Sequence, residues 1–177
     1  MASPVGHASV GLAAAAVVAR MTGTPPSFSL WFGAFIASGV PDLDVFLGVF
    51  GLRGPRYHRN ASHGLPALGA GVVLLWLLPG LPPSNLDPGV YWAWIAALFS
   101  HPILDVLTTG PRAGARGYGI ALAWPLSRKR WFLLKPILET ADFGACRSVG
   151  DVLLGVLPEM TRLVPVSALL FGLAVLA

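Results

Sequence analysis

The chain has 177 residues, of which 55% are hydrophobic and only 11% are charged, with a formal net charge of +4. A typical soluble domain carries about 25% charged residues, so this composition excludes an ordinary soluble protein and indicates one integral-membrane domain over residues 1–177. The single cysteine, Cys146, excludes an intrachain disulfide and a zinc site built from several cysteines. Basic residues are confined to a few loops, which is typical of membrane orientation and not of nucleic-acid binding.

The first two apolar segments predict helices at residues 4–19 and 28–40. Ser3 is suited to cap the first helix, and Pro4 fits its first turn. The region before residue 18 has neither a charged start nor a clear cleavage site, so we interpret it as a retained helix and not as a signal peptide. The second helix should stop at Pro41, and a polar connection follows over residues 42–64.

Further apolar segments predict helices at residues 65–81 and 91–108, and a last one at 149–177. Pro158 and Pro165 interrupt the last segment, which could be one long helix or a helix pair. A loop rich in glycine and arginine is expected over residues 109–130, followed by a short interfacial helix at 131–138. The predicted fold is therefore all-α, a polytopic bundle of about five transmembrane helices at about 20 residues per span.

In this topology, histidines and aspartates from distant segments gather at one membrane face, which we call side A, the side where the first helix begins. Imidazole and carboxylate are the ligands of zinc, manganese and iron sites. We therefore predict a site for two or more divalent ions, zinc first and manganese as the alternative. The seven candidate ligands on side A are His7, Asp42, Asp44, His58, His63, His101 and Asp105.

Two of the motifs carry carboxylates. His101 and Asp105 are four residues apart and project from one helix face, where ionisable groups inside a membrane are costly and usually functional. Asp42 and Asp44 would point the same way from an extended segment, and two such carboxylates repel each other unless a cation lies between them. The competing interpretations are a His–Asp hydrogen bond between helices for the first pair, and helix capping for the second.

The assignment of the remaining candidates as ligands depends on the motifs that lie near them. Taken alone, His58 and His63 would be exposed loop residues, and His7 would be an interfacial or capping residue. Arg59 is suited to bind an anionic oxygen, because guanidinium pairs bidentately with phosphate or carboxylate, or it is an orienting loop charge. Four acidic residues outside the motifs are expected to cap helices or pair between them: Glu139, Asp142, Asp151 and Glu159.

The basic residues predict the orientation of the chain. Loops on side A carry most of them, whereas side B carries only Arg20, at a helix end. By the positive-inside rule, side A and its metal site should face the cytoplasm, in the inner membrane of the cell. The side A residues are Arg53, Arg56, Arg59, Arg112, Arg116, Arg128, Lys129 and Arg130, and we interpret the last five as orientation signals and lipid-headgroup contacts.

Together these motifs resemble the YdjM-type inner-membrane metal-dependent hydrolases, a family also described as LexA-regulated. The resemblance covers about residues 4–130. Compared with the family pattern, Ser62 replaces a threonine and Gly64 replaces a serine, while Asp151 matches an acidic residue at the start of the last helix, where glutamate is more usual. The matching motifs are Gly6-His7, Pro41-Asp42-Leu43-Asp44, His58-Arg59-Asn60-Ala61-Ser62-His63-Gly64, His101 to Asp105 with Thr108, and Trp124-Pro125.

This resemblance implies a metal-dependent hydrolase, and the distribution of ligands over several helices is also similar to bacterial zinc-dependent phospholipase C. We expect the substrate to be a phosphoester of a lipid or another membrane-associated molecule, so the partners are membrane lipids and not nucleic acids. Asp42 or Asp44 would act as general base, and Arg59 would stabilise the phosphate charge.

Three alternatives differ in class. A metal transporter or sensor would need polar groups along a path, but residues 65–81 carry no charge and side B has only Asp87 as an acidic group. An intramembrane metalloprotease would be expected to carry a His-Glu-x-x-His motif, which this sequence lacks. The third alternative is a scaffold protein in which the metals are structural, and an open coordination position with bound water would separate the enzyme from it.

Overall fold

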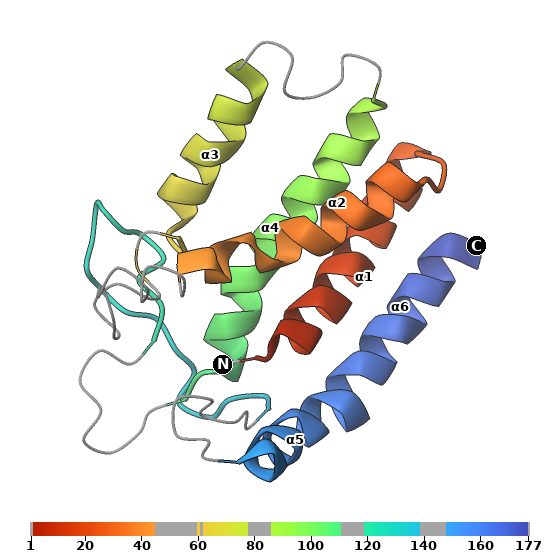
Figure 1. Cartoon of the computed structure of the whole chain (residues 1–177). Coiled ribbons are helices and arrows are strands. Elements are labelled where there is room, and N and C mark those ends of the chain that lie inside the picture. Colours follow the sequence, from red (N-terminus) through yellow and green to blue (C-terminus); the bar gives the residue numbers. More distant parts are fainter. Residues whose placement is uncertain are drawn as a thin grey trace.

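The computed structural model describes residues 2–44, 60, 62–77, 86–110, 119–138 and 148–176. This part of the chain is helical and contains no strand, as the all-α prediction requires. Figure 1 shows the helices in chain order. They are α1 (Pro4–Thr22), α2 (Phe28–Gly39), α3 (Leu65–Leu77), α4 (Pro88–Thr108), α5 (Val149–Pro158), a π-helical turn at Glu159–Leu163, and α6 (Val164–Leu176).

Three helical stretches are long and apolar enough to cross a membrane: α1, α4 and the continuous helix Val149–Leu176. The helix α2 has 12 residues and the described part of α3 has 13. At 1.5 Å per residue, each of these two covers roughly 20 Å of the roughly 30 Å hydrocarbon core. The described structure therefore supports a polytopic bundle with three full-length candidate spans.

Helix ends agree with the local sequence. The Ser3 hydroxyl accepts a hydrogen bond from the Gly6 amide at the start of α1, as predicted. This helix ends at Thr22, three residues later than predicted, and Gly23 follows it with a φ of 68°, the left-handed conformation that glycine adopts readily. Asp87 caps α4, which begins at Pro88, three residues before the predicted start.

Two local predictions are wrong. Residues 131–138 form no helix, because their amide groups bond to other segments: Trp131 pairs with Ile120, and the Ile137 amide donates to the Leu107 carbonyl. Residues 40–44 form a short 3₁₀ turn instead of an extended segment. Here the chain continues to wind beyond the end of α2, and Pro41 is compatible with it because the proline φ near −65° also suits a 3₁₀ turn.

The last apolar segment is one continuous helix with a π-helical turn at its centre. Figure 1 shows α5 nearly end-on and α6 from the side, so the helix axis bends at this turn. The turn follows Pro158, whose missing amide donor removes one hydrogen bond of the α-helical ladder. Because α6 packs along α1 and the chain does not reverse, this segment can cross the membrane only once.

The core of the bundle consists mainly of alanine side chains, with Leu30 and Val90, and these small residues bring α1, α2 and α4 close together. Close packing of small residues is the usual basis of helix association in membranes. A Cβ on Gly11 would lie 2.4 Å from the Ser38 Cβ, and one on Gly33 would lie 2.1 Å from the Trp94 ring. These approaches fix the end of α2 over α1 and α4. In Figure 1 the starts of α1 and α3 and the ends of α2 and α4 lie at one end of the bundle.

Candidate metal centre

The candidate site begins on α4, where His101 and Asp105 are both fully buried. The His101 Nδ1 donates a hydrogen bond to the Ser38 carbonyl oxygen at 2.6 Å, which leaves Nε2 as the ring nitrogen with an available lone pair. This atom lies 3.4 Å from the Asp42 Oδ1 and 3.7 Å from the Asp105 Oδ2. A backbone carbonyl that orients the far nitrogen of a histidine is a common feature of metal ligands.

His7 reaches the same place from the first two turns of α1. Its Nε2 lies 3.3 Å from the Asp105 Oδ1, and its ring stacks on His101 with centroids 3.5 Å apart and an interplanar angle of 6°. The backbone amide of His7 donates to the Ser3 carbonyl, so the position of this imidazole depends on the cap of α1.

His63 approaches from the residues just before α3. Its Nε2 lies 3.3 Å from the Asp105 Oδ2 and 3.5 Å from the Asp42 Oδ1. On the other edge of the ring, Nδ1 lies 2.9 Å from the Ser62 hydroxyl, which donates to Asp44. Asp42 and Asp44 therefore face the two opposite nitrogens of one imidazole.

The structure contains an unusual cluster of buried polar atoms without hydrogen-bond partners. They are the His7 Nδ1 and Nε2, the Asp42 Oδ1, the His101 Nε2, and both Asp105 carboxylate oxygens. More than about 90% of buried polar groups in proteins are paired, so this concentration requires an explanation. The separations of 3.3–3.7 Å exceed those of ordinary hydrogen bonds. They match ligand atoms that share a tetrahedral ion at about 2.0–2.1 Å, which lie about 3.3 Å apart.

The ligand atoms form two groups that meet at His101. One contains His7, His101 and Asp105, and the other contains Asp42, His63 and His101, with the ligand atoms of each group within 4.8 Å of one another. The donor set of imidazoles and carboxylates is suited to zinc or manganese. These residues therefore fit the predicted binding of divalent metal ions.

Electrostatics favour a cation at this position. Burial alone would lower the pKa of His63, but its contacts with Asp105 and Asp42 outweigh burial and raise that pKa to about 9. Burial alone would raise the pKa of Asp42, and its contacts with His101 and His63 instead hold that pKa well below its usual range. The Asp42 carboxylate thus remains charged, and its buried negative charge must be balanced by protons or by metal ions.

Six of the seven predicted ligands lie in this cluster or against it. The seventh, His58, falls outside the described residues, as does Arg59, the residue predicted to bind phosphate. Asp44 belongs to neither ligand group and acts on the Nδ1 side of His63. The prediction that Asp42 and Asp44 point the same way is wrong, because the 3₁₀ turn separates their directions.

Comparison with known proteins now bears on the resemblance seen in the sequence. The model of the family described as YdjM inner membrane protein matches residues 1–177. The chain belongs to the YdjM family. No match was found among curated proteins or among solved structures. Family membership and the three candidate spans establish an inner-membrane protein.

The two departures from the YdjM pattern have different structural settings. Ser62 retains the hydroxyl that bonds to Asp44 and contacts His63. At Gly64, a Cβ would lie 2.7 Å from the Trp124 carbonyl oxygen, so the absence of a side chain permits a close backbone approach. The adjacent Leu65 amide donates to the Leu122 carbonyl at 2.8 Å, which ties residues 121–124 to the start of α3.

Arg130 has a role that its loop position did not reveal. Its guanidinium donates to the Gly119 carbonyl at 2.8 Å and to the Asn60 side-chain oxygen at 2.7 Å. It therefore links two loops next to the cluster, in addition to the orientation role predicted from its charge, which stays a prediction. No spacing signal in the sequence relates Arg130 to Asn60.

Glu159 connects the last helix to the first. This carboxylate is fully buried and accepts hydrogen bonds from the Ser3 amide, at 2.8 Å, and from the Ser3 hydroxyl. The prediction of interhelical pairing is confirmed here, and Asp151 caps its own helix through a reciprocal box with Ser148. Glu139 and Asp142 fall outside the described residues. Through Ser3, Glu159 supports the turn of α1 that carries His7.

We expect the Glu159→Ala variant to lose about 1–3 kcal/mol of stability, because it leaves buried donors of Ser3 unpaired. Its metal content should also fall, since His7 then lacks a fixed position. Thermal unfolding in detergent and metal analysis measure the two effects. The matched control is Asp151→Ala, which removes an exposed cap and should leave metal content unchanged. Equal metal content in both variants would contradict the link to His7.

Proposed function

We propose that this protein is a membrane-embedded, metal-dependent hydrolase that cleaves a phosphoester of a lipid or another membrane-associated substrate. One observation carries the proposal: buried nitrogen and oxygen ligand atoms from α1, α4 and the turn after α2 converge without hydrogen-bond partners, and the His63 imidazole lies against them. Two adjacent ligand groups are the arrangement that two-metal phosphoesterases use.

Zinc or manganese ions bound here would acidify a water molecule and neutralise charge on the phosphate oxygens. The protein residues would divide the other tasks. His101 is held in one tautomer by Ser38, and Asp105 is buried between three imidazoles. The side chain of Asp42 is 26% exposed, against 6% for Asp44, so Asp42 is the carboxylate best placed to take a proton from an entering water as general base.

Asp44 is better suited to positioning, because it orients His63 directly and through Ser62. Arg59 is proposed to hold the phosphate charge, on the strength of its guanidinium and its place between His58 and Asn60 in the sequence. The excess of basic residues in the loops at this end supports a cytoplasmic orientation of the site. A lipid could then enter from the inner leaflet.

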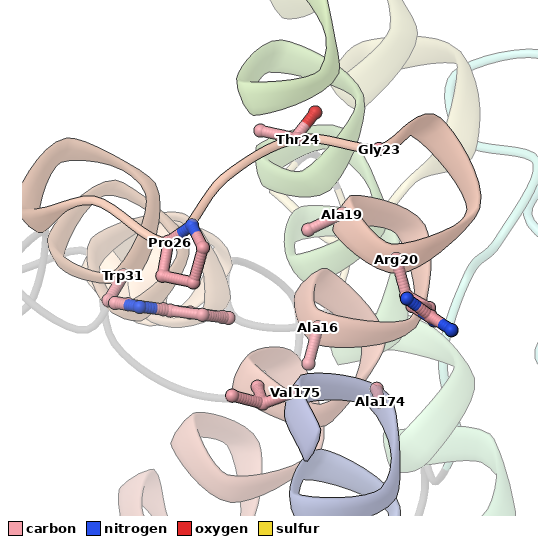
Figure 2. Close-up of a pocket in the computed structure, with 9 residues that line it drawn as sticks. All are labelled: Ala16, Ala19, Arg20, Gly23, Thr24, Pro26, Trp31, Ala174 and Val175. Carbon is pink, nitrogen blue, oxygen red and sulfur yellow. The ribbon is translucent and has the colours of Figure 1, made fainter. Parts of the chain in front are cut away.

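A metal transporter is a weaker candidate, because the polar cluster has no described continuation through the bundle. Figure 2 shows a pocket at the far end of α1, next to the end of α6. Its volume is about 170 Å³. Arg20 is the one charged residue in its lining, and no histidine or carboxylate is present there. A cationic residue in this position would repel a metal ion, so this pocket does not continue a route of metal-binding groups through the bundle.

A direct test uses the purified, full-length protein in vesicles that contain phosphatidylglycerol and phosphatidylethanolamine, with added zinc or manganese. Mass spectrometry of the lipids should show a phosphoester product that requires active protein and disappears after chelation. The matched control is Asp105→Asn, which keeps the size of a buried ligand and changes its charge. Equal product from wild type and control, or no product from metal-loaded wild type across phospholipid classes, would contradict the proposal.

A further inference from the structure

A second cavity lies near the metal centre but contains none of its ligands. It is an open pocket of about 560 Å³ between the segment around residue 136 and the bend in the last helix. We call it the Arg162 pocket. Its lining consists of Pro136, Ile137, Leu157, Pro158, Thr161 and Arg162.

The walls of the Arg162 pocket are tied to the two helices that carry His7 and Asp105. On one wall, the Ile137 amide donates to the Leu107 carbonyl of α4 at 2.9 Å. On the other wall, Glu159 follows Pro158 and bonds to Ser3 before α1. Hydrogen bonds therefore hold both walls of the pocket in place, at the same end of the bundle as the cluster.

The contact between Glu159 and Ser3 also fixes the depth of this pocket. Ser3 precedes the first turn of a candidate membrane span, so Glu159 lies at the level where that span begins. Arg162 is three residues further along the helix, about 4.5 Å deeper. From this position the long arginine side chain can extend back along the helix to the level of the lipid phosphates.

Arg162 is the only basic residue of the helix Val149–Leu176, and it is exposed. Its guanidinium forms no hydrogen bond or ion pair with another residue in the described ranges. The nearest acidic residue along the helix, Glu159, is directed to Ser3 instead. A charge at the edge of a membrane helix is costly without a partner, and an arginine is well suited to bind phosphate bidentately.

The surroundings of Arg162 match the rest of a lipid. No residue of α5 is buried inside the protein, and most of its leucine and valine side chains are exposed, so they are available to contact lipid. Leu157 and Ile137 give the pocket apolar walls beside the guanidinium. The lining carries one positive charge and no negative one, so it favours an anionic headgroup over a zwitterionic one.

We propose that the Arg162 pocket binds one anionic phospholipid, with its phosphate on Arg162 and the start of an acyl chain along Leu157 and Ile137. This site is separate from the metal cluster, and lipid binding there does not require hydrolysis. A retained lipid at this position would hold the bent helix against α4 and mark the membrane level of the site.

Native mass spectrometry of the detergent-purified chain with dioleoyl phosphatidylglycerol tests the proposal. We expect one tightly bound lipid in the wild type and about tenfold weaker binding in Arg162→Gln. The matched control is Arg128→Gln, an exposed arginine outside the pocket that should bind within about twofold of wild type. Arg162→Lys retains the charge and should recover part of the affinity, which separates charge loss from misfolding.

Two further measurements distinguish a bound lipid from free phosphate, and the lipid site from the hydrolase proposal. Millimolar inorganic phosphate should not displace the lipid, and phosphatidylcholine should bind more weakly than phosphatidylglycerol. The His101→Ala variant should bind the lipid as the wild type does, even if it has lost metal and activity. Unchanged binding in Arg162→Gln, or displacement by phosphate alone, would overturn the lipid site and leave the hydrolase proposal intact.

Discussion

The His101→Ala variant is expected to lose the divalent metal that we propose for the wild-type protein. The Nε2 of His101 is the atom at which the two ligand groups meet, so its removal disrupts both. It also leaves Asp42 and Asp105 facing each other with less positive charge between them. Because loss of a supporting contact alone weakens metal binding by about 10–100-fold, loss of this ligand should weaken it by at least about 100-fold.

Inductively coupled plasma mass spectrometry of detergent-purified protein measures this effect. The wild type should carry about two zinc or manganese ions per chain, and the variant close to none. Asp105→Ala should behave alike, whereas the exposed Asp151→Ala should retain the wild-type content. Membrane insertion should be unchanged in all three. Normal metal content in both His101→Ala and Asp105→Ala would refute the ligand assignment.

Replacement of Asp42 by asparagine should reduce kcat by about 10²–10⁴-fold, the usual contribution of a general base. The amide retains an oxygen that can contact a metal ion, but it cannot accept the proton. Activity should therefore fall much further than metal content does. The measurement is turnover on the phospholipid identified in the vesicle assay, expressed per bound metal ion.

Asp44→Asn is the matched comparison, because Asp44 acts through Ser62 and His63 and has a less exposed side chain. Its effect should be nearer the 10–100-fold typical of residues that orient a ligand. A larger loss in Asp44→Asn than in Asp42→Asn would transfer the role of general base to Asp44. Equal turnover per metal in Asp42→Asn and wild type would exclude Asp42 as the base.

The helices and the clustering of the candidate ligands could be predicted from the sequence for a clear physical reason. Long apolar segments must be helical in a membrane, and the spacing of His101 and Asp105 follows from helix geometry. The alternation of helix direction then placed the ligands from other segments at the same end. These arguments need only local sequence and topology.

Contacts between distant backbone groups could not be predicted from the sequence in the same way. The Ser38 carbonyl that orients His101 has no side-chain signal, and residues 131–138 are non-helical because their amides bond to other segments. The pairing of Glu159 with Ser3 was expected only as one of several possible helix contacts. Such contacts depend on how the helices pack, and a single sequence does not encode packing as a periodic pattern.

The bond between Glu159 and Ser3 joins groups that are 156 residues apart. During synthesis, α1 and α4 are translated before Glu159. The turn that carries His7 therefore gains its buried anchor only when the last helix docks. Assembly of the candidate metal centre is thus coupled to insertion of that helix, and a chain interrupted before it would contain every candidate ligand but lack the contact that fixes His7.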